Sequence, residues 1–171
     1  FENYIFLNPT GRWSDLPHAG QIYEYDQTKA LVSGLETRLI AHFWERFYFK
    51  MNFEYIYNQQ LNNDPAERYP LPFTPPLNVF TELRTELLKH NKGLKDFTVF
   101  LNLRYAADQN QISRNEEKTE GYMVFGTGIS TKIRVKKKTI ELNLKANNLL
   151  DTKYYNHISF YRKIEIPEQG R

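Results

Sequence analysis

Four polar side chains are the best candidates in this sequence for contact with a ligand. Glu116 and Glu117 are adjacent, and their carboxylates could meet a cationic or metal-bearing substrate; an ordinary solvated loop is the alternative. His157 follows Asp151 in the C-terminal segment and could contact a metal chelate, or could be a loop histidine without a ligand. Arg104 is one of several charges that could pair with one another or touch a substrate. We predict ligand binding by Arg104, Glu116, Glu117 and His157.

A resident metal, a cofactor and catalysis are not expected. The four histidines are scattered and show no spacing typical of metal ligands: His18, His42, His90 and His157. No nucleophile–base pair and no paired-carboxylate motif stands out, so we do not expect an enzyme. The sequence Gly126-x-Gly128 is not followed by a helix, so it is not a nucleotide loop.

The charge pattern gives no indication of a nucleic-acid partner. The net charge is +3, from 23 basic and 20 acidic residues that are well mixed along the chain. Residues 136–138 form the only basic run, which we interpret as a solvated turn between two strands. The chain has no cysteine, so its redox compartment cannot be inferred.

The elements that must position these side chains are strands with one apolar and one polar face. Between residues 139 and 148, Ile140, Leu142, Leu144 and Ala146 alternate with polar residues. Successive side chains of a strand point to opposite faces, so this alternation indicates a sheet with two different surfaces. In 31–43, 47–57, 79–89, 97–107 and 121–133 the odd-numbered residues form the apolar set, and Lys89 is the only charge among them.

The alternation predicts an all-β, antiparallel, up-and-down protein of about seven strands. The expected strands cover residues 2–8, 21–43, 46–58, 78–90, 96–107, 120–134 and 138–150. Short connections at 44–45, 91–96 and 135–138 alternate with longer ones at 9–20, 59–77, 108–119 and from 151 onward. Short turns at one rim and long loops at the other are typical of a transmembrane barrel. No run of about 18 apolar residues occurs, which excludes a transmembrane helix.

Two kinds of barrel fit this alternation. A soluble carrier of a small hydrophobic ligand has its apolar face inside, whereas a membrane barrel turns that face to lipid. The odd positions of 47–57 carry six large side chains in succession, which the interior of a small barrel could not hold. Phe43, Trp44, Phe47 and Phe97 gather at the short-turn rim, where an interfacial aromatic girdle would lie. We therefore favour the membrane barrel and keep the soluble carrier as the alternative.

Three segments resemble the C-terminal barrel of TonB-dependent outer-membrane receptors: 23–36, 107–122, and 144–155 together with 167–171. The most specific is Asn148-Leu149-Leu150-Asp151, followed by Tyr154 and later by a Pro-x-x-Gly-Arg sequence. The family's plug domain, its earlier strands and its final closing strand have no counterpart here. The resemblance therefore implies that residues 1–171 are a C-terminal portion of such a barrel.

The resemblance also implies a function, partners and a location. The parent receptor would take up a metal complex, such as a ferric siderophore, haem or cobalamin, across the outer membrane of a Gram-negative bacterium. Its partners would be the lipid bilayer, the metal chelate, and the TonB complex acting through the absent plug domain.

Overall fold

Antiparallel β-strands make up most of this protein. The computed structural model describes residues 1–16, 20–91 and 94–168. His18, the centre of the expected turn at 91–96, the side chain of His90 and the last residues of the Pro-x-x-Gly-Arg sequence lie outside the described residues. The strands are β1 (Tyr4–Trp13), β2 (Gln21–Thr28), β3 (Ala30–Phe43), β4 (Phe47–Gln60), β5 (Asn78–Asn91), β6 (Leu94–Ala106), β7 (Tyr122–Val135) and β8 (Lys138–Ala146). Two short 3₁₀ helices, η1 (Pro65–Glu67) and η2 (Phe160–Ile164), lie in the long connections.

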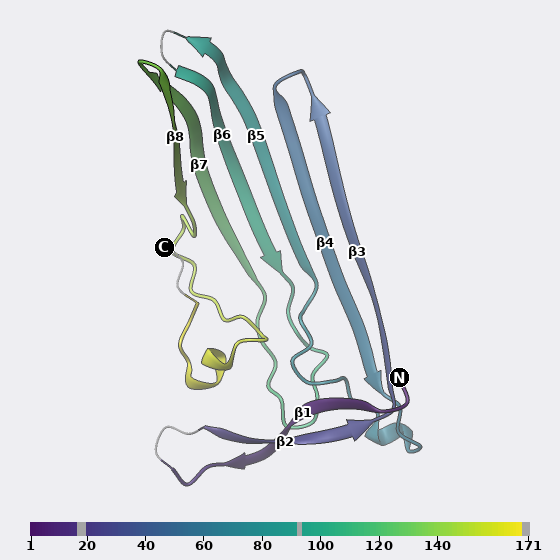
Figure 1. Ribbon diagram of the computed structural model, residues 1–171. Helices are drawn as coiled ribbons and strands as arrows, with labels where there is room; N and C mark the ends of the chain where they lie inside the picture. The colour runs from purple at the N-terminus through teal and green to yellow at the C-terminus, as the bar shows by residue number, and fades with distance from the viewer. Residues whose placement is uncertain (17–19, 92–93, 169–171) are drawn as a thin grey trace.

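Six of these strands form one antiparallel sheet in chain order, from β3 at one edge to β8 at the other. Figure 1 shows the short turns at one end of this sheet and the long connections at the other. The predicted all-β, up-and-down architecture is therefore confirmed. In the described part of the tail after β8 no further strand forms, so β8 remains an edge.

The first two strands differ from the prediction. The expected single strand at 21–43 is divided at Lys29 into β2 and β3, and β1 pairs with β2 alone. These two strands form a separate hairpin that lies across the loop end of the sheet (Figure 1). The described chain thus has eight strands against the predicted seven or so, and six of them form the large sheet. The reason is tertiary: Phe6 is buried with Ala30 and Leu71, which holds the hairpin against the loops.

The expected loop at 9–20 is shorter than predicted, because β1 continues to Trp13. Pro9 and Gly11 suggest a loop, but the pairing with β2 is irregular between Pro9 and Trp13. A proline without a donor and a glycine with φ of 75° are both tolerated at such an irregularity.

The pairing of the strands confirms the two faces. Leu39 lies opposite Met51, and Leu83 opposite Leu101, so odd positions share one face through four strands. Ile129 lies opposite Leu144, which brings the even-numbered apolar positions of β8 onto the same face. Side chains directly opposite in an antiparallel pair lie on one side of the sheet. We call this surface the apolar face and the opposite surface the polar face.

Near the short turns, the odd-numbered residues no longer all lie on the apolar face. An irregularity between Glu86 and Leu88 places Leu88, and not Leu87, opposite Phe97. A second irregularity lies between Lys95 and Thr98, next to Asp96 with its left-handed φ of 54°. Each extra residue shifts the alternation by one position. The odd-numbered pattern therefore does not continue in register past Glu86 on β5.

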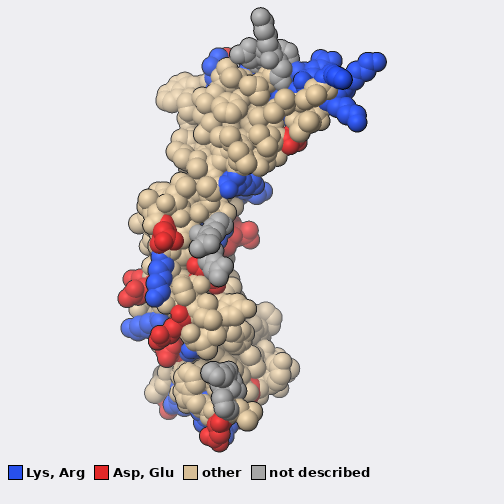
Figure 2. Space-filling view, turned by 90° about the vertical axis from the view of Figure 1, so that its left-hand side faces the viewer, with Lys and Arg blue, Asp and Glu red and all other residues tan. Residues whose placement is uncertain are grey.

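Aromatic rings gather at the short-turn rim. The rings of Phe43 and Phe47 stack at 5.6 Å, and Trp44 contacts both of them edge-on. Seen from the side of β8, the half of the molecule next to the short turns carries few charges apart from a blue group at the turns, whereas the loop half mixes red and blue (Figure 2). No helix among the described residues is long and apolar enough to cross a membrane.

Charged groups on the polar face lie over aromatic rings. The guanidinium of Arg84 lies 5.6 Å from the ring centre of Phe100, and the ammonium of Lys50 lies 5.6 Å from that of Phe80. Phe100 itself covers Gly128, where an added Cβ would come within 2.3 Å of the ring. The glycine is needed here because the ring and the strand approach too closely for a side chain.

Candidate functional site

The long connections pack into a layer at the end of the sheet opposite the short turns. We call this the loop layer: residues 61–77, 107–121 and 147–168, with the β1–β2 hairpin against them. Glu116 and Glu117 lie in the second connection and His157 in the third. Arg104 lies instead on β6, opposite Phe80 and Val124, on the polar face. The structure brings Glu116 and His157 together and leaves Arg104 apart from them.

Glu116 is held by the backbone of two connections. Its side chain is only 2% exposed. The amide of Ser113 donates to Oε2 at 3.1 Å, and the amide of Phe73 donates to Oε1 at 3.0 Å. The local chain forms a turn in which the amide of Glu116 donates to the carbonyl of Ser113. The residue before Glu116, Asn115, has a left-handed backbone conformation with φ of 63°. This turn directs the Glu116 carboxylate inward, so Glu116 itself does not lie in solvent as the alternative interpretation expected.

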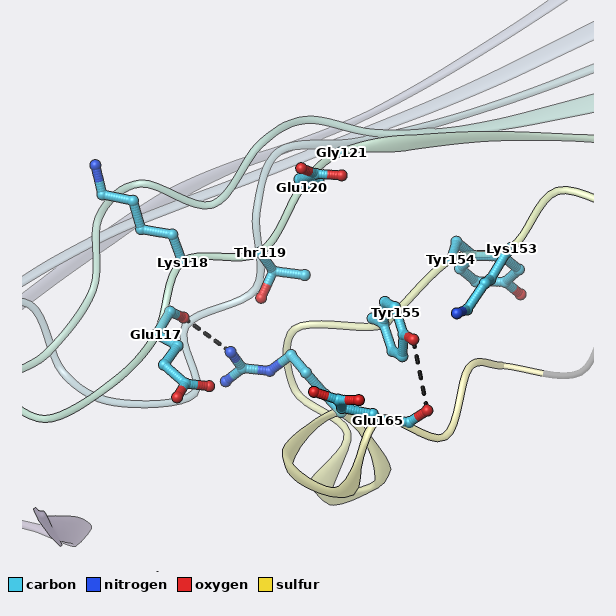
Figure 3. A pocket seen from close by; sticks show the side chains of 10 residues that line it. Glu117, Lys118, Thr119, Glu120, Gly121, Lys153, Tyr154, Tyr155 and Glu165 are labelled. Carbon is cyan, nitrogen blue, oxygen red and sulfur yellow. Dashed lines mark hydrogen bonds between the residues drawn. The ribbon is translucent and has the colours of Figure 1, made fainter.

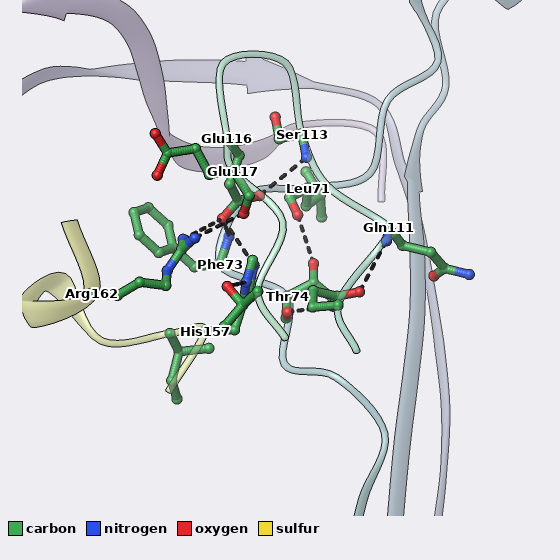
Figure 4. A network of polar contacts seen from close by, with 12 residues as sticks. Leu71, Phe73, Thr74, Gln111, Ser113, Glu116, Glu117, His157 and Arg162 are labelled. Carbon is green, nitrogen blue, oxygen red and sulfur yellow. Dashed lines mark hydrogen bonds and ion pairs between the residues drawn. The ribbon is translucent and has the colours of Figure 1, made fainter. Parts of the chain in front are cut away.

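Two cationic or ionisable side chains from the C-terminal segment meet this carboxylate (Figure 4). Nε2 of His157 lies 3.2 Å from Oε1 of Glu116, and the imidazole is 1% exposed. Nη2 of Arg162 lies 3.7 Å from the same oxygen, and its side chain is 6% exposed. Nδ1 of His157 contacts the hydroxyl of Thr119 at 2.8 Å, and Nη1 of Arg162 donates to the carbonyl of Glu117 at 2.8 Å. We call Glu116, His157 and Arg162 the buried triad.

The electrostatics of the buried triad favour an ionised carboxylate. Burial acts to raise the pKa of Glu116, but the contact with His157 and the amides of Phe73 and Ser113 together outweigh it. The pKa of Glu116 therefore lies below its ordinary value of 4.5. A buried carboxylate that accepts two amide hydrogen bonds and faces a guanidinium is a structural anchor between segments.

Further contacts join the rest of the loop layer to this anchor. The amide of the Asn115 side chain donates to the carbonyl of Pro9 at 3.2 Å, and Gln21 donates to the carbonyl of Asn115 at 3.3 Å. The ring of Tyr23 packs against Phe73 and Phe160, at 5.7 and 5.6 Å. The hairpin and all three connections are therefore tied together around the turn at Glu116.

A second buried network lies beside the first, where the strands enter the loop layer. Asn58 donates to the hydroxyl of Thr74 at 2.6 Å and accepts from the amide of Leu71 at 2.7 Å. Gln109 donates to the carbonyl of Thr74 at 2.7 Å. These buried amide side chains satisfy the polar backbone of the proline-rich connection, which cannot pair as a strand.

An open cleft of about 580 Å³ lies between the second and third connections (Figure 3). Its wall consists of Glu117, Lys118, Thr119, Glu120, Gly121, Lys153, Tyr154, Tyr155, Arg162 and Glu165. The ammonium of Lys153 lies 5.7 Å from the ring centre of Tyr155, and the Tyr155 hydroxyl donates to the carbonyl of Glu165 at 3.5 Å. Three acidic and three basic side chains with two phenols could receive a ligand that carries both signs of charge.

Of the four predicted ligand residues, Glu117 lines this cleft. Its carboxylate is 69% exposed and lies 3.5 Å from the ammonium of Lys163. Arg104, Glu116 and His157 do not line the cleft. Their binding to a ligand stays a prediction, and the burial of Glu116 and His157 gives these two a structural role in this chain.

Sequence reasoning missed Arg162, the third member of the buried triad, and Thr119, whose hydroxyl contacts His157. Arg162 is separated from Glu116 by a strand hairpin, and no motif marks either residue. The same holds for Lys153, Tyr154 and Tyr155 in the cleft, which the sequence presented as part of a strand-end motif. Among the described residues, no three His, Asp or Glu side chains gather as metal ligands.

Comparison with known proteins supports the fold. A scan against models of protein families gives no match, and a search of curated proteins gives none either. Among solved structures the chain is similar to the copper transporter OprC, with a TM-score of 0.72 and 18% sequence identity. The match covers 98% of this chain and 25% of OprC, so the chain spans about a quarter of that protein's length. At this identity the likeness shows the fold alone: a segment of a β-barrel.

The low pKa of Glu116 predicts that the loop layer loosens in acid. A carboxyl group with a lower pKa in the folded state stabilises the fold above its unfolded-state pKa, and this stabilisation is lost as the pH falls through the folded-state pKa. Limited proteolysis from neutral pH to below pH ~4 should show cleavage in residues 61–77 and 107–121 increasing at the acid end. Cleavage that is independent of pH would contradict an ionised Glu116 in the folded protein.

Proposed function

We propose that this chain is part of the wall of an outer-membrane receptor that imports a metal complex. The observation that carries the proposal is the apolar face, which runs without a break across six paired strands. An apolar surface of this extent on an antiparallel sheet is stable against lipid. The fold likeness to a copper transporter supports a transport role, and it adds a copper complex to the ferric siderophore, haem or cobalamin that the resemblance implies.

The unpaired edges of the sheet favour part of a larger membrane barrel over a closed soluble barrel. Within the described residues, β3 and β8 each pair on one side only. Membrane barrels have eight or more strands, and every backbone group of a lipid-facing strand needs a partner. A six-stranded sheet therefore requires further strands to close. The soluble carrier would need a small closed barrel around its ligand, and the six-stranded sheet gives no support to it.

The proposal includes TonB-dependent uptake, in which this chain forms part of the barrel and of its outer surface. The sheet supplies wall, the loop layer supplies an outer surface with the cleft at 117–121 and 153–165, and the polar face lines the lumen. Energy would enter through the TonB complex acting on a plug domain outside this chain.

The test is uptake by cells that contain or lack the full-length protein. Radiolabelled iron in a ferric siderophore, haem, cobalamin and a copper complex should be offered separately. We expect saturable uptake of one of them, lost when an uncoupler collapses the proton gradient while binding to the cell surface remains. Uptake that resists the uncoupler would contradict TonB dependence, and uptake of none of the four would contradict a metal-complex receptor.

A further inference from the structure

The turn between β7 and β8 carries an exposed group of cations. Arg134, Lys136, Lys137 and Lys138 fall within five consecutive positions, and all four are exposed. We call these four residues the basic turn. Across the described ranges, none of the four has an acidic partner within ion-pair distance. Lys132, two positions before Arg134, differs in this respect because it pairs with Asp96 at 2.9 Å.

The register of the β7–β8 pair places this charge at the margin of the apolar face. Val135 lies opposite Lys138, and Ile133 lies opposite Ile140. Lys138 therefore ends the stripe formed by Ile140, Leu142 and Leu144, all of them exposed. An aliphatic stripe that ends in a lysine suits a membrane surface, because the methylene stem stays in the apolar layer while the ammonium reaches the headgroups.

The aromatic cluster marks the same level on the molecule. Phe43, Trp44 and Phe47 lie at the β3–β4 turn, which is at the same end of the sheet as the basic turn (Figure 1). Aromatic rings of this kind occupy the interface between the hydrocarbon layer and water. Figure 2 shows blue side chains that project from the turn end next to a surface with few charges. The basic turn thus lies where phosphate headgroups would be.

We propose that the basic turn binds the phosphate headgroups of anionic phospholipids in the leaflet that meets the short-turn rim. This inference rests on the proposed function, since it needs the apolar face to lie in a bilayer. Four cations without an ion-pair partner repel one another in a bare solvated turn, and anionic headgroups remove that repulsion. One basic residue at a membrane surface favours anionic lipid by about fivefold.

The test measures which lipid contacts the basic turn. The full-length protein carries a small fluorophore on Ile140→Cys, two positions from Lys138, and is reconstituted in mixed vesicles of phosphatidylglycerol and phosphatidylcholine. Either one lipid or the other has brominated chains, which quench the fluorophore on contact. The ratio of the two quenching efficiencies, corrected for composition, gives the local preference for phosphatidylglycerol. We expect a preference of about fivefold or more, reduced by high salt.

Matched variants separate the basic turn from net charge. Lys136→Gln, Lys137→Gln and Lys138→Gln together should reduce the preference towards the composition of the vesicle, with only Arg134 of the basic turn remaining. Lys29→Gln, Lys50→Gln and Lys145→Gln remove the same charge from the loop end and the polar face, and should leave it unchanged. Equal quenching by both lipids in the unaltered protein would overturn this inference and leave the proposed function intact. No quenching by either lipid would place Ile140 away from the bilayer and overturn both.

Discussion

Replacing Leu39 by Arg should weaken folding of the full-length protein into a bilayer by about 2–4 kcal/mol, the cost of an arginine that faces lipid near mid-membrane. Leu39 lies four residues before the end of β3, opposite Met51 on the apolar face, and is 48% exposed. The guanidinium there has no water and no acidic partner in the apolar layer. The free energy can be measured by folding into phosphatidylcholine vesicles against urea.

Ile40 provides the matched control for this substitution. It is the next residue of the same strand, is 47% exposed, and lies opposite Lys50 on the polar face. Ile40→Arg should cost less than about 1 kcal/mol, because we expect the polar face to meet water and a cross-strand pair such as the new arginine with Lys50 changes stability by less than about 1 kcal/mol. If both arginines cost the same, or if Ile40→Arg costs more, the apolar face does not meet lipid.

Replacing Glu116 by Gln should destabilise the loop layer by about 3–5 kcal/mol, because it leaves the buried cation of Arg162 without a counter-charge. The substitution changes no volume, and it removes the anion that accepts amide hydrogen bonds from Phe73 and Ser113. Hydrogen exchange on the full-length protein should show faster exchange at these two amides, together with amides of the hairpin that the loop layer holds. The sheet amides should change little, since local opening need not reach them.

Glu117→Gln is the control, because this neighbouring carboxylate is 69% exposed and has one long contact with Lys163. Lys163 is 9% exposed, but its partner carboxylate lies in solvent and the contact is long, so Glu117→Gln should raise amide exchange less than Glu116→Gln does. Adding Arg162→Met to Glu116→Gln should restore part of the lost stability, since the uncompensated charge is then gone. Equal effects of Glu116→Gln and Glu117→Gln would show that the buried triad does not hold the loop layer.

The prediction of a membrane barrel depended on the alternation of apolar and polar residues along each strand. Such a local pattern can be recognised directly in a sequence. Side chains such as Leu39, Leu83 and Leu101 fall on one face because the period of a strand is two, whatever the rest of the fold does. The strand positions from β4 to β8 followed from this period within a few residues. Proline and glycine then located the long connections and the short turns correctly.

The errors arose where a non-local contact competes with the local pattern. The expected strand at 21–43 runs through Lys29, yet the chain divides there into β2 and β3, where Phe6 packs against Ala30 and Leu71. The bulge at Leu87 leaves no sequence signal, because an extra apolar residue in an apolar run keeps the composition unchanged. Register is a property of two strands, so one strand's sequence cannot report it.

By itself, the sequence determined the strands, their two faces and the unequal rims, because each depends on residues within one strand or turn. Only the tertiary structure decided that Glu116 meets His157 and Arg162. These residues come from connections separated by a complete β7–β8 hairpin, and no spacing rule links positions that far apart. The packing of the loop layer also turned two predicted ligand residues into a buried anchor, because burial depends on the surrounding chain and not on residue type. The cleft beside Glu117 exists for the same reason: it is the space left where two connections pack around that anchor.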